Sequence, residues 1–149
     1  MDKKKAVKVI ENVNSDWLKI EEAIDWLGDN NQIGCLVKIA EDSDLVTRCE
    51  ITECLGGLKQ IKYLIKALGD ENWLVRHEAV KWLGRHKEIK YLIKALDDRD
   101  SNVRYEAVEW LGKHKQIKYL KKAVGDSDEI VACKAEVWLE KCGEKSVNE

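Results

Sequence analysis

The stretch Tyr63–Lys90 reads YLIKALGDENWLVRHEAVKWLGRHKEIK, and the next stretch, Tyr91–Lys118, reads YLIKALDDRDSNVRYEAVEWLGKHKQIK. The two are identical at 19 of 28 positions. Self-similarity at a fixed period of this length is the signature of repeat proteins, whose units stack in a row and bury a shared core. The repeat therefore decides the architecture before any local pattern is considered.

The same 28-residue period runs through the whole chain. Its clearest marks are an unbroken leucine column and a glycine column directly after it, Leu27, Leu55, Leu83, Leu111, Leu139 and Gly28, Gly56, Gly84, Gly112. We expect one domain over residues 1–149. It holds five repeats, near 7–34, 35–62, 63–90, 91–118 and 119–146.

The two end copies depart from the pattern, as capping repeats do. The first copy diverges in its opening half, and the fifth has Ala132 where the others carry arginine. Apolar Val131, Val137 and Trp138 lie near the end of the last copy. An end repeat could therefore stack on another copy of the chain, so self-association through an end is one expectation.

Composition excludes several classes of protein. The net charge is −2 over 149 residues, so no global field draws the chain to nucleic acid or membrane. No apolar run approaches the ~20 residues of a membrane span, and the opening MDKKKAVKVIENV has no apolar stretch long enough for a secretory signal, so we expect none. The five cysteines are odd in number and form no C-x-x-C pair, which argues against a disulfide framework. We expect a reduced, cytoplasmic protein without a cofactor.

Each copy has the pattern of two helices. In the third copy Ile61, Leu64, Ile65 and Leu68 recur at helical spacing, and Val75, Ala79, Trp82 and Leu83 form a second apolar stripe. The second helices should begin after good N-caps, Asp16, Asp44, Asn72, Asp100 and Asp128. Gly84 is a candidate for the position just after the second helix, and Gly69 and Gly125 for the ends of first helices. We expect an all-α fold, a right-handed α-solenoid.

The pattern D-x4-V/T-R-x2-A/I-x3-L-G resembles the HEAT-like repeats found in phycobilin lyases and many archaeal and bacterial proteins. It occurs as Asp42 with Arg48, Asp70 with Arg76, and Asp98 with Arg104. The resemblance covers nearly the whole chain. It implies five two-helix HEAT-like repeats, a concave surface lined by second helices, and a ladder of Asp and Arg side chains between neighbouring repeats. An arginine offers a fork of donors suited to this role.

If the second helices line the concave side, the residues facing it can be assigned at about 100° per residue. One column is acidic, and others are mixed or apolar, so we expect a non-catalytic scaffold that binds a basic or amphipathic protein or peptide. The predicted contacts are Glu50, Trp73, Leu74, His77, Glu78, Tyr105 and Glu106. The bland alternative is that these are solvated helix faces.

The first helices carry the opposite charge, with lysine columns Lys38, Lys66, Lys94, Lys122 and Lys62, Lys90, Lys118. Nucleic-acid binding by this convex side is a further alternative. At the acidic side, repulsion disfavours a phosphate backbone.

A metal site is another alternative. The pair His77–Glu78 resembles the His-Glu pairs of deoxyhypusine hydroxylase, a HEAT-like di-iron enzyme, although only this one copy matches. Cys49, Glu50, His77 and Glu78 could converge on zinc or iron, since thiolate, imidazole and carboxylate all ligate these metals. His86 and His114, flanked by cations, are interpreted as solvated loop residues. The tryptophan column is interpreted as packing between repeats.

Overall fold

The computed structural model describes residues 1–12 and 14–144, and within them it contains ten α-helices and no β-strand. The end expected for the fifth repeat, residues 145–146, lies outside the described residues. The helices are α1 (Lys3–Glu11), α2 (Trp17–Asp29), α3 (Ile33–Asp42), α4 (Leu45–Gly57), α5 (Ile61–Ala67), α6 (Trp73–Arg85), α7 (Ile89–Ala95), α8 (Ser101–Lys113), α9 (Ile117–Ala123) and α10 (Glu129–Lys141).

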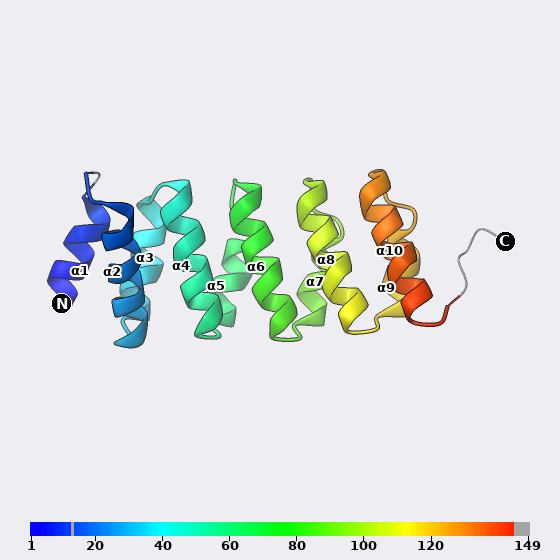
Figure 1. Cartoon of the computed structure of the whole chain (residues 1–149), viewed down its shortest axis with the longest axis horizontal. Helices are drawn as coiled ribbons and strands as arrows, with labels where there is room; N and C mark the ends of the chain where they lie inside the picture. Colours follow the sequence, from blue (N-terminus) through cyan, green and yellow to red (C-terminus); the bar gives the residue numbers. More distant parts are fainter. Residues whose placement is uncertain (13, 145–149) are drawn as a thin grey trace.

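Successive helices pair, and the pairs stand side by side in one row with α1 and α10 at opposite ends of the row (Figure 1). The even-numbered second helices form one layer and the odd-numbered first helices the other. Each second helix packs broadly on the second helix of the next pair, whereas first helices of successive pairs touch much less. The expected α-solenoid of paired helices is confirmed. We call the contacts between successive pairs the first to fourth interfaces, counted from the N-terminus.

The second helices begin where the sequence predicts. The side-chain oxygens of Asp16, Asp44, Asn72, Asp100 and Asp128 accept hydrogen bonds from backbone N–H groups two or three residues ahead. These bonds satisfy N–H groups that have no partner within the helix. One repeated residue type thus fixes the start of every second helix.

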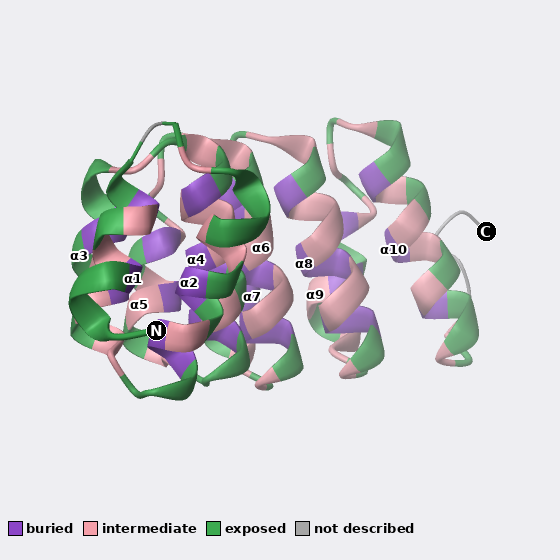
Figure 2. Cartoon of the chain, turned by 60° about the vertical axis from the view of Figure 1, so that its left-hand side comes forward, coloured by how far each residue is buried: buried purple, intermediate pink, exposed green. Residues whose placement is uncertain are grey.

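Buried residues occur along the whole row (Figure 2), in three clusters that all pack against the partly buried Tyr63. The predicted Val75, Ala79 and Leu83 are buried, and all five residues of the leucine column are inaccessible to solvent. Trp82 is only half-buried and packs at the edge of the core. Because each repeat covers the apolar face of its neighbour, no single repeat has a closed core of its own.

The prediction that Gly84 lies after its helix is wrong. Gly84 is inside α6, which continues to Arg85, and the left-handed residue that follows the helix is Lys87, with φ of 61°. The reason for the glycine lies in the next repeat. A Cβ atom on Gly84 would lie 2.1 Å from Cγ of Trp110, so only glycine leaves room for that indole.

Gly56 and Gly112 accommodate Trp82 and Trp138 in the same way. At the first interface Gly28 faces the smaller Cys54 instead, and an added Cβ would lie 2.7 Å from its Sγ. Gly69 and Gly125 do follow the ends of the first helices α5 and α9, directly after the caps Leu68 and Val124. The interpretation of the tryptophans as packing groups between repeats agrees with these contacts.

The Asp–Arg ladder joins neighbouring repeats through two-pronged ion pairs. Arg48 Nε lies 3.1 Å from Asp70 Oδ2, and the closest contacts of Arg76 to Asp98 and of Arg104 to Asp126 are 2.8 Å. Each arginine also donates to a loop carbonyl of its own repeat. The first and fifth repeats carry Ile20 and Ala132 at this position, so the ladder spans the second to fourth interfaces only.

Candidate binding face on the second helices

The outward sides of α2, α4, α6, α8 and α10 form a surface that we call the second-helix face. An apolar rim lies along the starts of these helices: Leu18 is 64% exposed, Val46 55% and Leu74 40%. The rim is interrupted by Asn102 on α8 and ends in exposed Ile130. Trp73 is half-buried beside it and meets the His77 ring edge-on at a centroid distance of 6.3 Å. Leu74 is therefore open to a partner, and Trp73 is partly so.

At the fourth interface an ammonium group already occupies the face. Lys134 Nζ of α10 lies 2.6 Å from Glu109 Oε2 of α8 and 4.9 Å from the centre of the Tyr105 ring. Lys113 and the indole of Trp138 also donate to Glu109, at 3.1 and 3.0 Å. Burial alone would raise the pKa of Glu109, but these donors outweigh it and hold the pKa at about 2. In this part of the face the carboxylate is therefore already neutralised by the protein's own cations and is not free to bind a cationic partner.

The third interface is closed in a similar way. His77 Nε2 of α6 lies 3.4 Å from Glu106 Oε2 of α8, and the Trp110 indole donates to Glu106 Oε1 at 2.8 Å. Burial acts to raise the pKa of Glu106, yet the hydrogen bonds from His77 and Trp110 bring it below its usual value. Two of the predicted contact residues, His77 and Glu106, therefore bind each other.

Glu78, at the second interface, is also engaged within its own helix. Its Oε1 accepts from Lys81 Nζ at 2.8 Å and from the Trp82 indole at 2.9 Å. The pKa of Cys49 on α4 is raised to about 11, by burial and by the charge of Glu78. A thiol with so high a pKa is neither a good nucleophile nor a ready metal ligand at neutral pH.

The first interface differs from all the others. Glu50 of α4 makes no ion pair within the described part of the chain, and its nearest charged neighbours are carboxylates. Burial raises the pKa of Glu50, and the negative charges of Glu53, Glu21 and Asp25 raise it further. The sequence predicts one uniform acidic column; the structure shows a gradient, from unpaired carboxylates at α2 and α4 to paired ones at α8 and α10.

The four residues considered for a metal site do not form one. Among the described residues no group of three or more His, Cys, Asp or Glu side chains is arranged to hold a metal ion. Glu78 is held by Lys81 and Trp82, while His77 turns to Glu106 on the following helix. The described residues therefore show no convergence of Cys49, Glu50, His77 and Glu78, and the metal-site alternative stays an untested hypothesis.

The interpretation of His86 and His114 as solvated loop residues is also wrong. Their Nε2 atoms lie 2.7 Å from the backbone oxygens of Gly56 and Gly84, one repeat earlier. Their rings stack on Trp82 and Trp110 at 5.9 Å. Each histidine thus adds a contact between repeats to a carbonyl at the end of the preceding second helix, which also accepts from the backbone N–H of Lys59 or Lys87.

The lysines of the first helices are exposed, as the charge pattern predicts. Some of them join neighbouring repeats: Lys66 pairs with Glu41 at 2.6 Å and Lys122 with Asp97 at 3.0 Å. The two layers therefore carry opposite charge at the N-terminal end, and the contrast weakens toward the C-terminal end.

No helix in residues 1–12 and 14–144 is long and apolar enough to cross a bilayer.

The repeating helix pair, its buried leucines and the Asp–Arg ladder agree with a comparison to protein families, in which the model for HEAT repeats matches residues 61–140. This chain belongs to the HEAT-repeat family. The expected family is thereby confirmed at the level of HEAT repeats.

Two solved structures are similar in fold. YibA of Escherichia coli is 17% identical over 92% of this chain, with a TM-score of 0.70. An engineered protein is 18% identical over 95% of this chain and 80% of its own, with a TM-score of 0.52. The HEAT-repeat chain described here spans only 58% of the YibA chain. A search of curated proteins gives no significant match. At such low identity these likenesses support the fold alone.

Proposed function

We propose that this HEAT-repeat protein is a non-catalytic scaffold that binds a basic, amphipathic segment of a partner protein on its second-helix face. The observation that carries the proposal is the first interface. There Glu21, Asp25, Glu50 and Glu53 gather without a cation, beside the exposed apolar residues Leu18 and Val46.

The fourth interface supports the choice of a cationic partner. Glu50 and Lys134 occupy the same position of the repeat, as do Asp25 and Glu109. At the fourth interface the carboxylate of this pair is neutralised by the protein's own ammonium group. At the first interface both positions are acidic, so a lysine or arginine from outside would supply the missing charge. Such complementarity favours encounter with basic partners and rejects acidic ones.

The apolar rim supports the choice of an amphipathic segment. Leu18, Val46 and Leu74 lie at one repeat position on α2, α4 and α6, about one helix spacing apart. A partner helix with a lysine face and a leucine face could bury the rim and reach the carboxylates together, as helices do in apolar grooves. Second helices pack more broadly on each other than first helices do. The row should therefore curve so that the second-helix face is concave and surrounds the bound segment.

A non-catalytic role fits the side chains on this face. The Cys49 thiol is held protonated, and Glu50 at the first interface has no histidine or cation partner in the described part of the chain that could activate a nucleophile or base. The hydroxylase alternative needs converging metal ligands, which the described residues do not provide. The nucleic-acid alternative has the exposed lysines of the first helices in its favour, but part of that charge is paired with Glu41 and Asp97.

Fluorescence anisotropy with a labelled amphipathic lysine–leucine helix tests the proposal. The variant Glu50→Lys places at the first interface the residue type found at the fourth, and should weaken binding by about tenfold or more, since it removes one attraction and adds one repulsion. The control is Glu129→Lys, which makes the same change of charge at an exposed position of α10 and should change the affinity less than twofold. Equal affinities of the wild type and Glu50→Lys would refute the proposed surface.

A peptide of the same leucine pattern with glutamates in place of lysines should not bind. Affinity for the basic peptide should fall as salt rises through the range where the Debye length shortens from roughly 10 to 3 Å. Tight, salt-independent binding of both peptides would show a purely apolar surface and would contradict the role given to the carboxylates.

A further inference from the structure

A cleft recurs between successive first helices, on the layer away from the second-helix face. It is found between α1 and α3, between α3 and α5 and between α5 and α7. The same four repeat positions line each one: the first cleft has Cys35, Lys38, Ile39 and Asp42 where the next has Tyr63, Lys66, Ala67 and Asp70. The three clefts are therefore copies of one feature, and they can be compared position by position.

Their sizes differ in one direction. The α1/α3 cleft has a volume of about 540 Å³, the α3/α5 cleft about 410 Å³ and the α5/α7 cleft about 280 Å³. The first two values fall in the range of roughly 300 to 1,000 Å³ that is usual for ligand sites, and the first cleft is the largest of the three. The lining of the first cleft includes the apolar side chains of Val7, Ile10, Ile20, Cys35 and Ile39.

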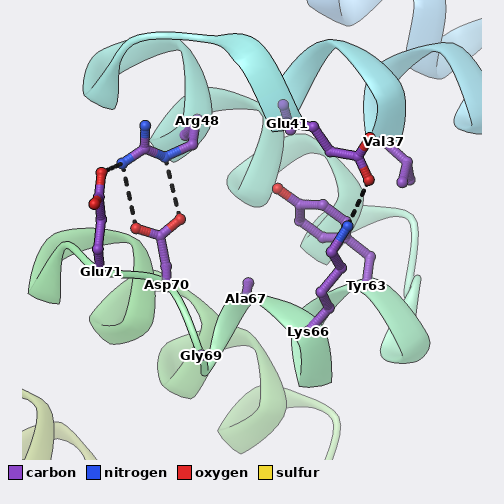
Figure 3. A pocket seen from close by; sticks show the side chains of 10 residues that line it. Val37, Glu41, Arg48, Tyr63, Lys66, Ala67, Gly69, Asp70 and Glu71 are labelled. Atoms are coloured by element: carbon purple, nitrogen blue, oxygen red, sulfur yellow. Dashed lines mark hydrogen bonds and ion pairs between the residues drawn. The ribbon is translucent and has the colours of Figure 1, made fainter.

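Figure 3 shows how the chain closes the second of these clefts. The Arg48 guanidinium reaches from α4 and binds both carboxylate oxygens of Asp70, at 3.1 and 3.3 Å. The Tyr63 side chain lies in the same cleft, and its hydroxyl is 3.3 Å from Thr52 Oγ1. On the opposite side Lys66 binds Glu41 at 2.6 Å. In this cleft, therefore, the protein's own Arg48 and Lys66 bind the carboxylates, and its own Tyr63 occupies part of the space.

In the first cleft two of these three side chains are missing. Ile20 stands at the position of Arg48, and Cys35 stands at the position of Tyr63. Asp42, at the position of Asp70, is exposed and makes no ion pair with any residue of the described ranges. The cleft has therefore lost a guanidinium and an aromatic ring, and it keeps the carboxylate that the guanidinium would bind.

The charges around the first cleft are mainly negative. Glu11, Asp42 and Asp44 line it together with one cation, Lys38. Asp44 caps α4 and accepts from the Thr47 N–H at 2.9 Å, and this hydrogen bond keeps the pKa of Asp44 below its usual value. The cleft is thus an apolar cavity under a net negative rim, which excludes anionic ligands and favours a cation with an apolar body.

We propose that the α1/α3 cleft is a second binding site, which takes an arginine and an adjacent apolar side chain from a partner protein. The arginine guanidinium pairs with Asp42, as Arg48 pairs with Asp70, and the apolar side chain fills the space that a tyrosine occupies in the other copies. Arginine is preferred to lysine because its planar fork matches both oxygens of a carboxylate. This site lies on the opposite layer from the second-helix face and goes beyond the function proposed above.

The experiment uses the full ¹⁵N-labelled chain and two blocked tripeptides, Ac-Leu-Arg-Leu-NH₂ and its analogue with citrulline, an uncharged isostere of arginine. Titration with the arginine peptide should shift amide resonances of α1 and α3, with saturation at millimolar concentrations. The citrulline peptide should bind about tenfold more weakly, because it lacks the charge-assisted pair. Equal binding of both peptides, or shifts confined to other helices, would overturn the proposal.

Two variants locate the site. Ile20→Arg lets the chain supply its own guanidinium to Asp42 and should abolish the shifts in α1 and α3, whereas the control Ile20→Leu should keep the affinity within about twofold. Because Ile20 is partly buried, Asp42→Asn at an exposed position provides a second test that does not threaten folding. It should reduce the affinity for the arginine peptide to that for the citrulline peptide. Unchanged affinity in Asp42→Asn would overturn the assignment.

Discussion

The first and fourth interfaces of this solenoid use the same repeat positions and fill them with different chemistry. At the fourth, Trp138 covers Gly112, Arg104 binds Asp126 and Lys134 neutralises Glu109. At the first, the equivalent positions hold Cys54 against Gly28, Ile20 near Asp42, and Glu50 beside Asp25. Each of these three contacts, present at the fourth interface, is weakened or absent between the first and second repeats. The first interface therefore has the weakest contacts between its own repeats, and its unpaired carboxylates are available to a partner.

The largest effect should come from breaking the Asp–Arg ladder at the fourth interface. Arg104→Met leaves the Asp126 carboxylate, whose side chain is only 10% exposed, without its counter-ion. We expect the free energy of unfolding in urea to fall by about 3 kcal/mol, since an uncompensated buried charge is costly. The control is Lys122→Met, which removes the exposed pair with Asp97 and should cost less than about 0.5 kcal/mol. Similar losses in both variants would show that the ladder is an ordinary surface contact.

The glycine column should give the next effect and distinguish the two interfaces directly. Gly112→Ala forces a Cβ to within 2.2 Å of the Trp138 ring and should cost about 2 kcal/mol. Gly28→Ala meets the smaller Cys54 at 2.7 Å and the end of the Leu58 side chain at 3.3 Å, and should cost clearly less. Gly34→Ala in α3 has no neighbouring atom within 4 Å and should stabilise the protein by about 0.5–1 kcal/mol, because alanine is the better helix former. Thermal unfolding of the three variants is sufficient, and equal losses at positions 28 and 112 would contradict the packing account.

Much of this contrast was predictable from sequence and part was not. The period, the N-caps, the leucine core and the repeat positions of Asp and Arg follow from residue type at fixed spacing. The tryptophan contacts of Gly84 were also available in principle, because a glycine column and a tryptophan column 26 residues later are both visible in the sequence. Helix periodicity says which residues share a face. It does not say which of them meet across an interface, such as His77 with Glu106 or His86 with the Gly56 carbonyl.

Acid should affect the two ends of the face in opposite directions. The pKa of Glu109 lies at about 2, below its usual value of 4.5, so its stabilising pairs are intact above pH 4.5 and are lost as the pH falls toward 2. Glu50 has a raised pKa, so its charge destabilises the folded state at neutral pH, and protonation on acidification relieves the strain. At pH 7 Glu109→Gln should cost about 1 kcal/mol after allowance for solvent screening, whereas Glu50→Gln should stabilise.

Urea unfolding of Glu109→Gln and Glu50→Gln between pH 3 and 7 checks these signs. The difference from wild type should shrink for both variants as the pH falls, because Glu50 becomes protonated in the folded protein and Glu109 becomes protonated in the unfolded chain. If Glu50→Gln destabilised the protein at pH 7 as Glu109→Gln does, the distinction between an open and a closed end of the face would be lost.

The most direct test of the central claim is a residue-resolved NMR titration of the full chain with the amphipathic lysine–leucine helix. The account predicts that amide shifts concentrate on the outward sides of α2 and α4 and at the start of α6, where unpaired carboxylates lie beside Leu18, Val46 and Leu74. The reciprocal variant Lys134→Glu should extend the shifts to α8 and α10. Shifts centred on α8 and α10 in the wild type, or on the first helices, would contradict it.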